Sequence, residues 1–293
     1  MRLHTLNITL LAGLSFLLGS EPCIPEESPI SGIPVSIHTW GNPENQASLP
    51  VPNTLDVYQE VISNEWGWTG LKADGTINGW GTPALVNTQP FEAPSDGGYI
   101  AIVSNAQAFA ALKEADGSIF AWGLPGWGGS AAGSVHGNAA PVDAGYTKIV
   151  SAGQAFAALK ADGSISAWGR LFFEDASTGA PGDGDYTRIV SNIGAFAALK
   201  EADGSISAWG SPDYGGTGAP GDGGYTRIVS AEAAFAALKE DGSISVWGSL
   251  TRHTGTDSLS EAATFAPSDT GYIDLYSTGY MMVALREDGS ITV

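Results

Sequence analysis

The dipeptide Trp-Gly recurs along nearly the whole chain and constrains its fold more than any other feature. It begins at Trp40, Trp80, Trp122, Trp168, Trp209 and Trp247, at spacings of 38 to 46 residues. Upstream of most copies the same text returns, as in 195–210 (AFAALKEADGSISAWG) and 234–248 (AFAALKEDGSISVWG). A fixed period of this length indicates a protein built from stacked copies of one unit.

Each copy predicts three short strands. A Tyr-Thr-Arg-Ile-Val-Ser type segment is rich in β-branched residues, and Ala-Phe-Ala-Ala-Leu-Lys then meets Ser-Ile-Ser-Ala-Trp across an Asp-Gly turn. Asp-Gly favours a hairpin because glycine adopts positive φ without steric cost. A fourth strand could come from the variable stretch after Trp-Gly. Strands that are apolar on both faces suit sheets packed between two neighbours, so we expect an all-β propeller with the repeated Trp packed between blades.

The copies resemble the regulator of chromosome condensation (RCC1) repeat family. Val150–Gly153, Ala158-Leu159, Asp162-Gly163 and Trp168-Gly169 fall in register with its pattern, and 211–218 matches its glycine-rich loop. The resemblance covers about residues 34–293 and implies an RCC1-like β-propeller of seven blades. One departure is that Phe109, Phe156, Phe196 and Phe235 stand where the family has a histidine, which predicts apolar packing in place of a buried hydrogen bond.

Six blades are visible in the sequence, ending near residues 81, 123, 169, 210, 248 and 293. Residues 34–41 (PVSIHTWG) read as a closing strand without a preceding partner, and the last copy stops where its Trp is expected. We therefore expect an incomplete seven-bladed ring, cut short at its C-terminus. The alternative is a six-bladed ring in which one terminal strand is redundant.

The first 33 residues differ from the repeats. Arg2 precedes an apolar stretch from Ile8 to Leu18, so residues 1–20 are predicted to be a signal peptide and 21–33 a linker. A secreted, periplasmic or cell-surface protein is expected, with no membrane span once the leader is removed. Cys23 admits a lipoprotein alternative, although Glu21 and Pro22 precede it where small residues are needed.

Charge and composition narrow the possible partners. The formal net charge of −19 argues against nucleic acid, because no basic stripe is present to displace counterions from phosphates. The same acidity favours a soluble monomer. One cysteine and four scattered histidines supply no metal-ligand spacing, so neither a metal site nor a cofactor is predicted.

The Asp residues of the six Asp-Gly turns are assigned to the hairpins, since a catalytic site needs unlike groups that converge once. No enzymatic activity is predicted; a lyase or glycosidase on a propeller scaffold is the alternative. Calcium in the loops Pro94–Gly97, Pro181–Asp185 and Pro220–Gly223 is a further alternative.

The stretches after Trp-Gly differ most between copies, and loops on a rigid rim often carry binding. Aromatic and Arg side chains are common anchors of protein contacts, which makes Trp127, Phe172, Phe173, Tyr214 and Arg252 the predicted binding residues. The alternative is that these aromatics fold back as plugs over the blade edges. The predicted function is a non-enzymatic scaffold for an extracellular protein or glycan. A guanine-nucleotide exchange factor, the activity of the resembled family's namesake, is the second hypothesis.

Overall fold

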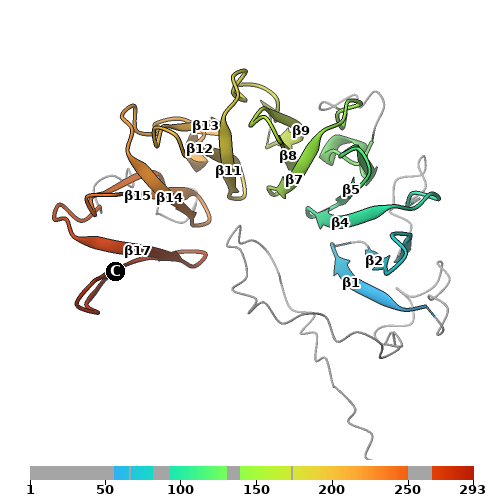
Figure 1. Cartoon of the computed structure of the whole chain (residues 1–293), viewed down its shortest axis with the longest axis horizontal. Coiled ribbons are helices and arrows are strands. Elements are labelled where there is room, and N and C mark those ends of the chain that lie inside the picture. The colour runs from blue at the N-terminus through green and yellow to red at the C-terminus, as the bar shows by residue number, and fades with distance from the viewer. Residues whose placement is uncertain (1–55, 66, 82–92, 131–138, 173, 250–265) are drawn as a thin grey trace, which may run out of the picture.

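The computed structural model describes residues 56–65, 67–81, 93–130, 139–172, 174–249 and 266–293. These residues form six antiparallel sheets in chain order, which we call blades 1 to 6. Figure 1 shows the blades side by side around an open arc, with blades 1 and 6 at its two ends. The expectation of an all-β propeller with six blades is confirmed. The leader, the linker and the 34–41 strand lie outside the described residues, and the seventh blade stays a prediction.

Every blade contains a meander of three short strands, and blade 3 adds a fourth. Blade 1 holds β1 (Tyr58–Ser63), β2 (Gly67–Lys72) and β3 (Ile77–Gly81). Blade 2 holds β4 (Tyr99–Ser104), β5 (Ala108–Lys113) and β6 (Ile119–Gly123). Blade 3 holds β7 (Tyr146–Ser151), β8 (Ala155–Lys160), β9 (Ile165–Leu171) and a short β10 (Glu174–Asp175). The fourth strand that the variable stretch could supply is therefore seen, within the described residues, in blade 3 alone.

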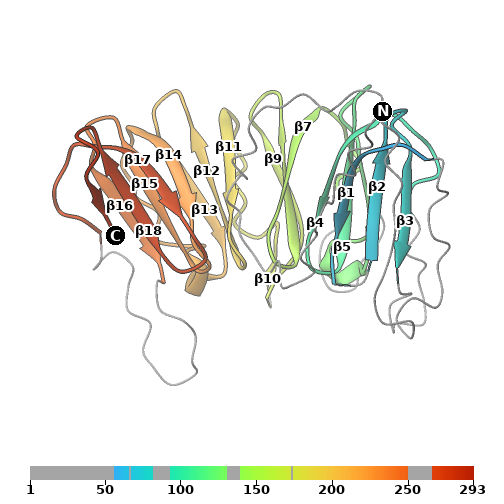
Figure 2. The same ribbon diagram turned by 90° about the horizontal axis from the view of Figure 1, so that it is seen from below.

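The second half of the arc repeats this plan. Blade 4 holds β11 (Tyr186–Ser191), β12 (Ala195–Lys200) and β13 (Ile206–Gly210). Blade 5 holds β14 (Tyr225–Ser230), β15 (Ala234–Lys239) and β16 (Ile244–Gly248). Blade 6 holds β17 (Tyr272–Ser277), β18 (Met282–Arg286) and β19 (Ile291–Thr292). In Figure 1 the first strand of each blade lies innermost, on the concave side of the arc, and Figure 2 shows the blades side by side from a direction at right angles to this view.

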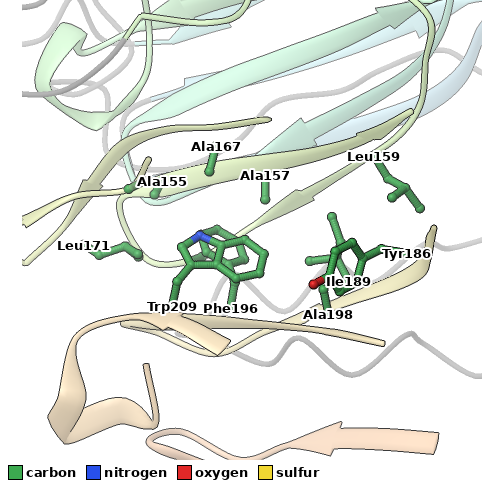
Figure 3. Close-up of a cluster of buried hydrophobic side chains, with 12 residues drawn as sticks. Ala155, Ala157, Leu159, Ala167, Leu171, Tyr186, Ile189, Phe196, Ala198 and Trp209 are labelled. Atoms are coloured by element: carbon green, nitrogen blue, oxygen red, sulfur yellow. The ribbon is translucent and has the colours of Figure 1, made fainter. Parts of the chain in front are cut away.

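The core lies between blades, where the Ala-Phe-Ala-Ala-Leu strand sends alternate side chains to opposite neighbours. Phe196 and Trp209 of blade 4 pack on Ala155 and Ala157 of blade 3, as Figure 3 shows. The two rings are stacked, with centroids 5.2 Å apart. Small alanines on the facing strand leave room for this pair. The predicted packing role of the repeated Trp is confirmed, as is the apolar role of the Phe at the family's histidine position.

The Asp-Gly turns of blades 1 to 5 each close their own hairpin and also dock on the next blade. The Asp162 carboxylate accepts hydrogen bonds from the Ser164 backbone N–H at 2.9 Å and hydroxyl at 2.7 Å. Gly163 adopts φ 78°, and its carbonyl accepts the Tyr186 N–H of blade 4 at 3.2 Å. A Cβ on Gly163 would lie 2.4 Å from the Asp185 backbone nitrogen. Glycine is thus required twice, for its dihedral angle and for the close approach.

A second row of contacts joins the blades at the opposite end of the inner strands. The Ser191 hydroxyl donates to the Ser151 carbonyl oxygen at 2.6 Å, and the Gly153 N–H donates to the Ile193 carbonyl oxygen at 3.0 Å. With the hairpin tips at one end and these bonds at the other, each blade is fixed to its neighbour at both ends. No helix in the described part is both long and apolar enough to span a membrane.

Candidate functional site

The loops that follow Trp-Gly in blades 2 and 4 share a compact local structure. Each forms one 3₁₀ turn, Pro125–Trp127 or Pro212–Tyr214, which the proline favours because its φ is preset. A glycine in the left-handed region ends each turn, Gly128 at φ 84° and Gly215 at φ 81°. The carbonyl oxygens of these glycines accept the indole N–H groups of Trp168 and Trp247 in the following blades, at 3.1 and 3.0 Å. Each loop therefore also caps the Trp of its neighbour.

Two of the predicted binding residues, Trp127 and Tyr214, sit in these turns and are half-buried. Trp127 packs against the cluster between blades 2 and 3, and Tyr214 against the one between blades 4 and 5. Their carbonyl oxygens accept the side-chain amides of Asn105 and Asn192, each at 2.7 Å. The alternative of local plugs accounts for part of both residues, and each residue keeps part of its surface in solvent.

Tyr214 also forms a stacked pair with Phe172, which lies after β9 in the neighbouring blade. The ring centroids are 4.5 Å apart with an interplanar angle of 23°. Gly194 lies beneath the pair, and a Cβ there would come within 2.8 Å of carbons of both rings. Burial raises the pKa of the Tyr214 phenol, so it stays neutral at physiological pH. The structure brings these two predicted residues together across two blades.

Phe172 adopts φ 58°, a left-handed conformation that is rare for a bulky side chain. Such strain persists only where surrounding contacts impose it, and it is concentrated at functional sites. Phe173 and Arg252, the other two predicted binding residues, lie outside the described residues. The assignment of the five residues to a binding site stays a prediction.

A cluster that was not predicted from the sequence recurs in all six described blades. An Asp ahead of the first strand accepts the hydroxyl of that strand's Tyr and pairs with the basic residue that ends the second strand. In blade 5, for example, Asp222 accepts Tyr225 at 2.9 Å and pairs with Lys239. The Lys239 ammonium lies 4.9 Å from the centroid of the Tyr225 ring, within cation–π range. The clusters are Asp56–Tyr58–Lys72, Asp96–Tyr99–Lys113, Asp143–Tyr146–Lys160, Asp183–Tyr186–Lys200, Asp222–Tyr225–Lys239 and Asp269–Tyr272–Arg286.

These clusters occupy the loops for which calcium was considered. Each of the three loops contributes one of these carboxylates, Asp96, Asp183 or Asp222, and each of them is engaged by a Lys and a Tyr of its own blade. The part of the chain that the structure describes holds no group of three or more His, Cys, Asp or Glu residues placed to bind a metal. The spacing could have revealed this role, because the basic residue follows the Tyr by 14 positions in all six blades.

The clusters predict a loss of stability in acid. Hydrogen bonds from Lys239 and then Tyr225 hold the pKa of Asp222 below its usual range. The folded state favours the charged form, so the stabilisation is present above the unfolded pKa of about 4 and is lost as the pH falls through the folded pKa. Asp222→Asn is therefore expected to lower the Tm at pH 7, and the gap to wild type closes as the pH falls below about 4.

Thermal melts followed by circular dichroism across this pH range test the point. Glu201→Gln is the control, because it removes one carboxylate from an exposed position in the hairpin of blade 4, at the same edge of the blades as Asp222. This variant is expected to melt close to wild type at every pH. A gap for Asp222→Asn that does not change with pH would contradict the role given to the ion pair.

Neither a protein-family model nor a curated protein matches the sequence. Among solved structures, the chain is similar to the CRINKLY WD40 ectodomain of the Arabidopsis thaliana receptor kinase ACR4, at 18% identity and a TM-score of 0.44, over 70% of this chain and 68% of that one. Human WBSCR16 is similar at 15% identity and a TM-score of 0.47, over 82% and 75% of the two chains. Yeast RCC1 (Prp20), in a crystal structure with Kap60 bound, is similar at 16% identity and a TM-score of 0.42, over 66% and 55%. The structures similar to the chain thus include one from the family that its repeat resembles.

Proposed function

We propose that this protein is a non-catalytic scaffold that binds an extracellular protein through the loops that follow Trp-Gly. These loops lie at the edge of the blades opposite the Asp-Gly hairpins. The observation that carries the proposal is the Phe172–Tyr214 stack, which joins two blades and holds Phe172 at φ 58°. Packing of a Phe ring does not by itself require a strained backbone. A rigid aromatic pair with part of its surface in solvent is suited to anchoring a partner, because little side-chain entropy is lost on binding.

The absence of an enzymatic role is part of the same proposal. The carboxylates that recur in the described blades have structural partners: those of the Asp-Gly turns accept from Ser or Thr, and those of the loops pair with Lys or Arg. Secretion is proposed from the leader-like pattern of residues 1–20. Measurement of the mature N-terminus tests this, and an uncleaved cytosolic protein would overturn it.

The binding test uses substitutions at Phe172. Phe172→Gly removes the ring but suits the left-handed backbone, which offsets the lost packing with relief of strain of about 1–3 kcal/mol. We expect its Tm to stay near that of wild type while affinity for the extracellular partner falls at least tenfold, as for the loss of a hot-spot aromatic. Cross-linking in the extracellular fraction identifies the partner, and titration with that purified partner measures the affinity.

A matched control places a substitution at the opposite edge of the blades, where the Asp-Gly hairpins lie. Val142 is 93% exposed beside the Asp143–Tyr146–Lys160 cluster, and Val142→Ser is expected to leave binding unchanged. If wild type and Phe172→Gly bound the partner with equal affinity, the Phe172–Tyr214 stack would not be part of the binding site. Binding to purified oligosaccharides, and not to a protein, would show that the ligand is a glycan. Accelerated nucleotide release from a small GTPase would instead favour the exchange-factor hypothesis.

A further inference from the structure

A carboxylate lies beside the Phe172–Tyr214 stack, on the side of the next blade. Glu232 belongs to the loop between β14 and β15 of blade 5 and is half-buried. Burial, and after it the negative charges of Glu232 and Asp213, raise the pKa of the Tyr214 phenol. The Glu232 carboxylate is therefore close enough to the Tyr214 hydroxyl to act on it electrostatically, and the stack has an anionic border.

The backbone of Glu232 is fixed by the blade that follows, but its side chain is not. The Glu232 N–H donates to the Gly279 carbonyl oxygen of blade 6 at 2.7 Å, the same edge contact that Gly153 makes with Ile193 between blades 3 and 4. Among the described residues, neither a hydrogen bond nor an ion pair to the Glu232 carboxylate is present. A half-buried carboxylate has lost part of its hydration, so a cationic partner would stabilise it.

Aromatic surface also lies on the far side of Glu232. Tyr280 follows Gly279 in the loop between β17 and β18 of blade 6, and it is 57% exposed. In blade order, Glu232 thus lies between the stack of blades 3 and 4 and the exposed Tyr280 of blade 6, all at the edge of the blades where the Trp-Gly loops begin. We call four residues the Glu232 patch: Phe172, Tyr214, Glu232 and Tyr280.

We propose that the Glu232 patch binds an arginine side chain of the partner protein, flanked in the partner by apolar residues. This inference rests on the proposed function, because it names the residue by which the partner is recognised. A guanidinium donates two parallel hydrogen bonds to a carboxylate and also stacks on an aromatic face, so one arginine can use both Glu232 and Tyr214. The net charge of −19 favours the approach of a basic segment. The apolar residues beside the arginine contact Phe172 and Tyr280.

The test is fluorescence anisotropy with two fluorescein-labelled peptides, Gly-Leu-Arg-Leu-Gly and a copy in which citrulline, a neutral isostere, replaces the arginine. Wild type is expected to bind the arginine peptide at least tenfold more tightly, in line with charge-assisted hydrogen bonds to a partly desolvated carboxylate. Glu232→Gln is expected to bind both peptides equally. Its Tm is expected to stay near that of wild type, because the structure gives the lost carboxylate no partner among the described residues. Equal binding of the two peptides by wild type would overturn the proposal.

Glu240→Gln is the matched control for the charge. It removes one carboxylate from the same blade, at an exposed position in the Asp-Gly hairpin on the opposite edge. This variant is expected to keep the preference for arginine. A loss of preference equal to that in Glu232→Gln would reduce the effect to overall charge and overturn the proposal.

Phe172→Gly separates this inference from the proposed function. It removes an apolar contact, so it is expected to weaken both peptides by a similar factor and to retain the preference for arginine. If Phe172→Gly weakens both peptides but Glu232→Gln keeps the preference, the rim site stands and arginine recognition is wrong. If Glu232→Gln abolishes the preference while Phe172→Gly binds like wild type, arginine recognition stands and the stack is not its anchor.

Discussion

Replacing Phe196 by alanine is expected to lower the free energy of unfolding by about 3–5 kcal/mol, as for other fully buried aromatic residues. The Phe196 side chain has no exposed surface and stacks on Trp209. Both rings fill the space left by Ala155 and Ala157 of blade 3, so the cavity opens between two blades. The neighbouring side chains are short alanines on one side and a rigid Trp on the other, and none of them can fill the cavity. The cavity is therefore expected to shrink little. Urea denaturation followed by Trp fluorescence measures the loss.

Phe120 provides the comparison for this substitution. It lies in β6 of blade 2, is 37% exposed, and makes a tilted contact with Trp122 at 6.2 Å between centroids. Phe120→Ala removes the same atoms from a site that keeps access to water, and we expect a loss of about 1 kcal/mol or less. Similar losses at both positions would mean that the interface between blades contributes no more than the outer surface of a blade.

Replacing Gly163 by alanine is expected to cost about 2–4 kcal/mol. The left-handed backbone at φ 78° accounts for about 1–2 kcal/mol of this with any other L-residue. The rest comes from displacing blade 4, because the new Cβ would meet the backbone nitrogens of Asp185 and Tyr186. Those nitrogens donate to the carbonyl oxygens of Asp162 and Gly163 at 3.2 Å, and each such bond contributes about 1 kcal/mol.

Gly289 separates the two contributions. It occupies the same place in the hairpin of blade 6 at φ 81°, but no atom of the described residues lies within 4 Å of the Cβ it would carry. Gly289→Ala should therefore show the dihedral cost alone, about 1–2 kcal/mol. The difference between the two variants, measured in the same denaturation experiment, is the contribution of hairpin docking. Equal values would show that the tip of blade 3 contributes nothing to holding blade 4.

The fold was predictable because the same pattern of strands and turns returns in each copy of the repeat. Trp209 has a counterpart at the same place in each of blades 1 to 5, and a residue that recurs from module to module indicates packing. The alternation of Ala155, Phe156 and Ala157 already assigns opposite faces to them. The seventh blade was inferred from the resemblance and from the ends of the chain, and it stays a prediction.

The site was less predictable, for two physical reasons. The Asp222–Tyr225–Lys239 cluster depends on which residues meet at one end of a meander, and hydrophobic periodicity carries no information on charged partners. The Phe172–Tyr214 stack joins stretches of differing length, whose geometry no repeat specifies.

Hairpin docking gives the arc a direction. The amides of Tyr99, Tyr146, Tyr186, Tyr225 and Tyr272 each donate to a glycine carbonyl in the preceding blade, never in the following one. Protection of the Tyr186 amide from solvent exchange is therefore a property of blade 3, and opening blade 3 would expose an amide that belongs to blade 4. Local opening of one blade is therefore expected to raise the hydrogen-exchange rate of the Tyr amide in its C-terminal neighbour. In this protein, a residue's own amide reports on the stability of the module before it.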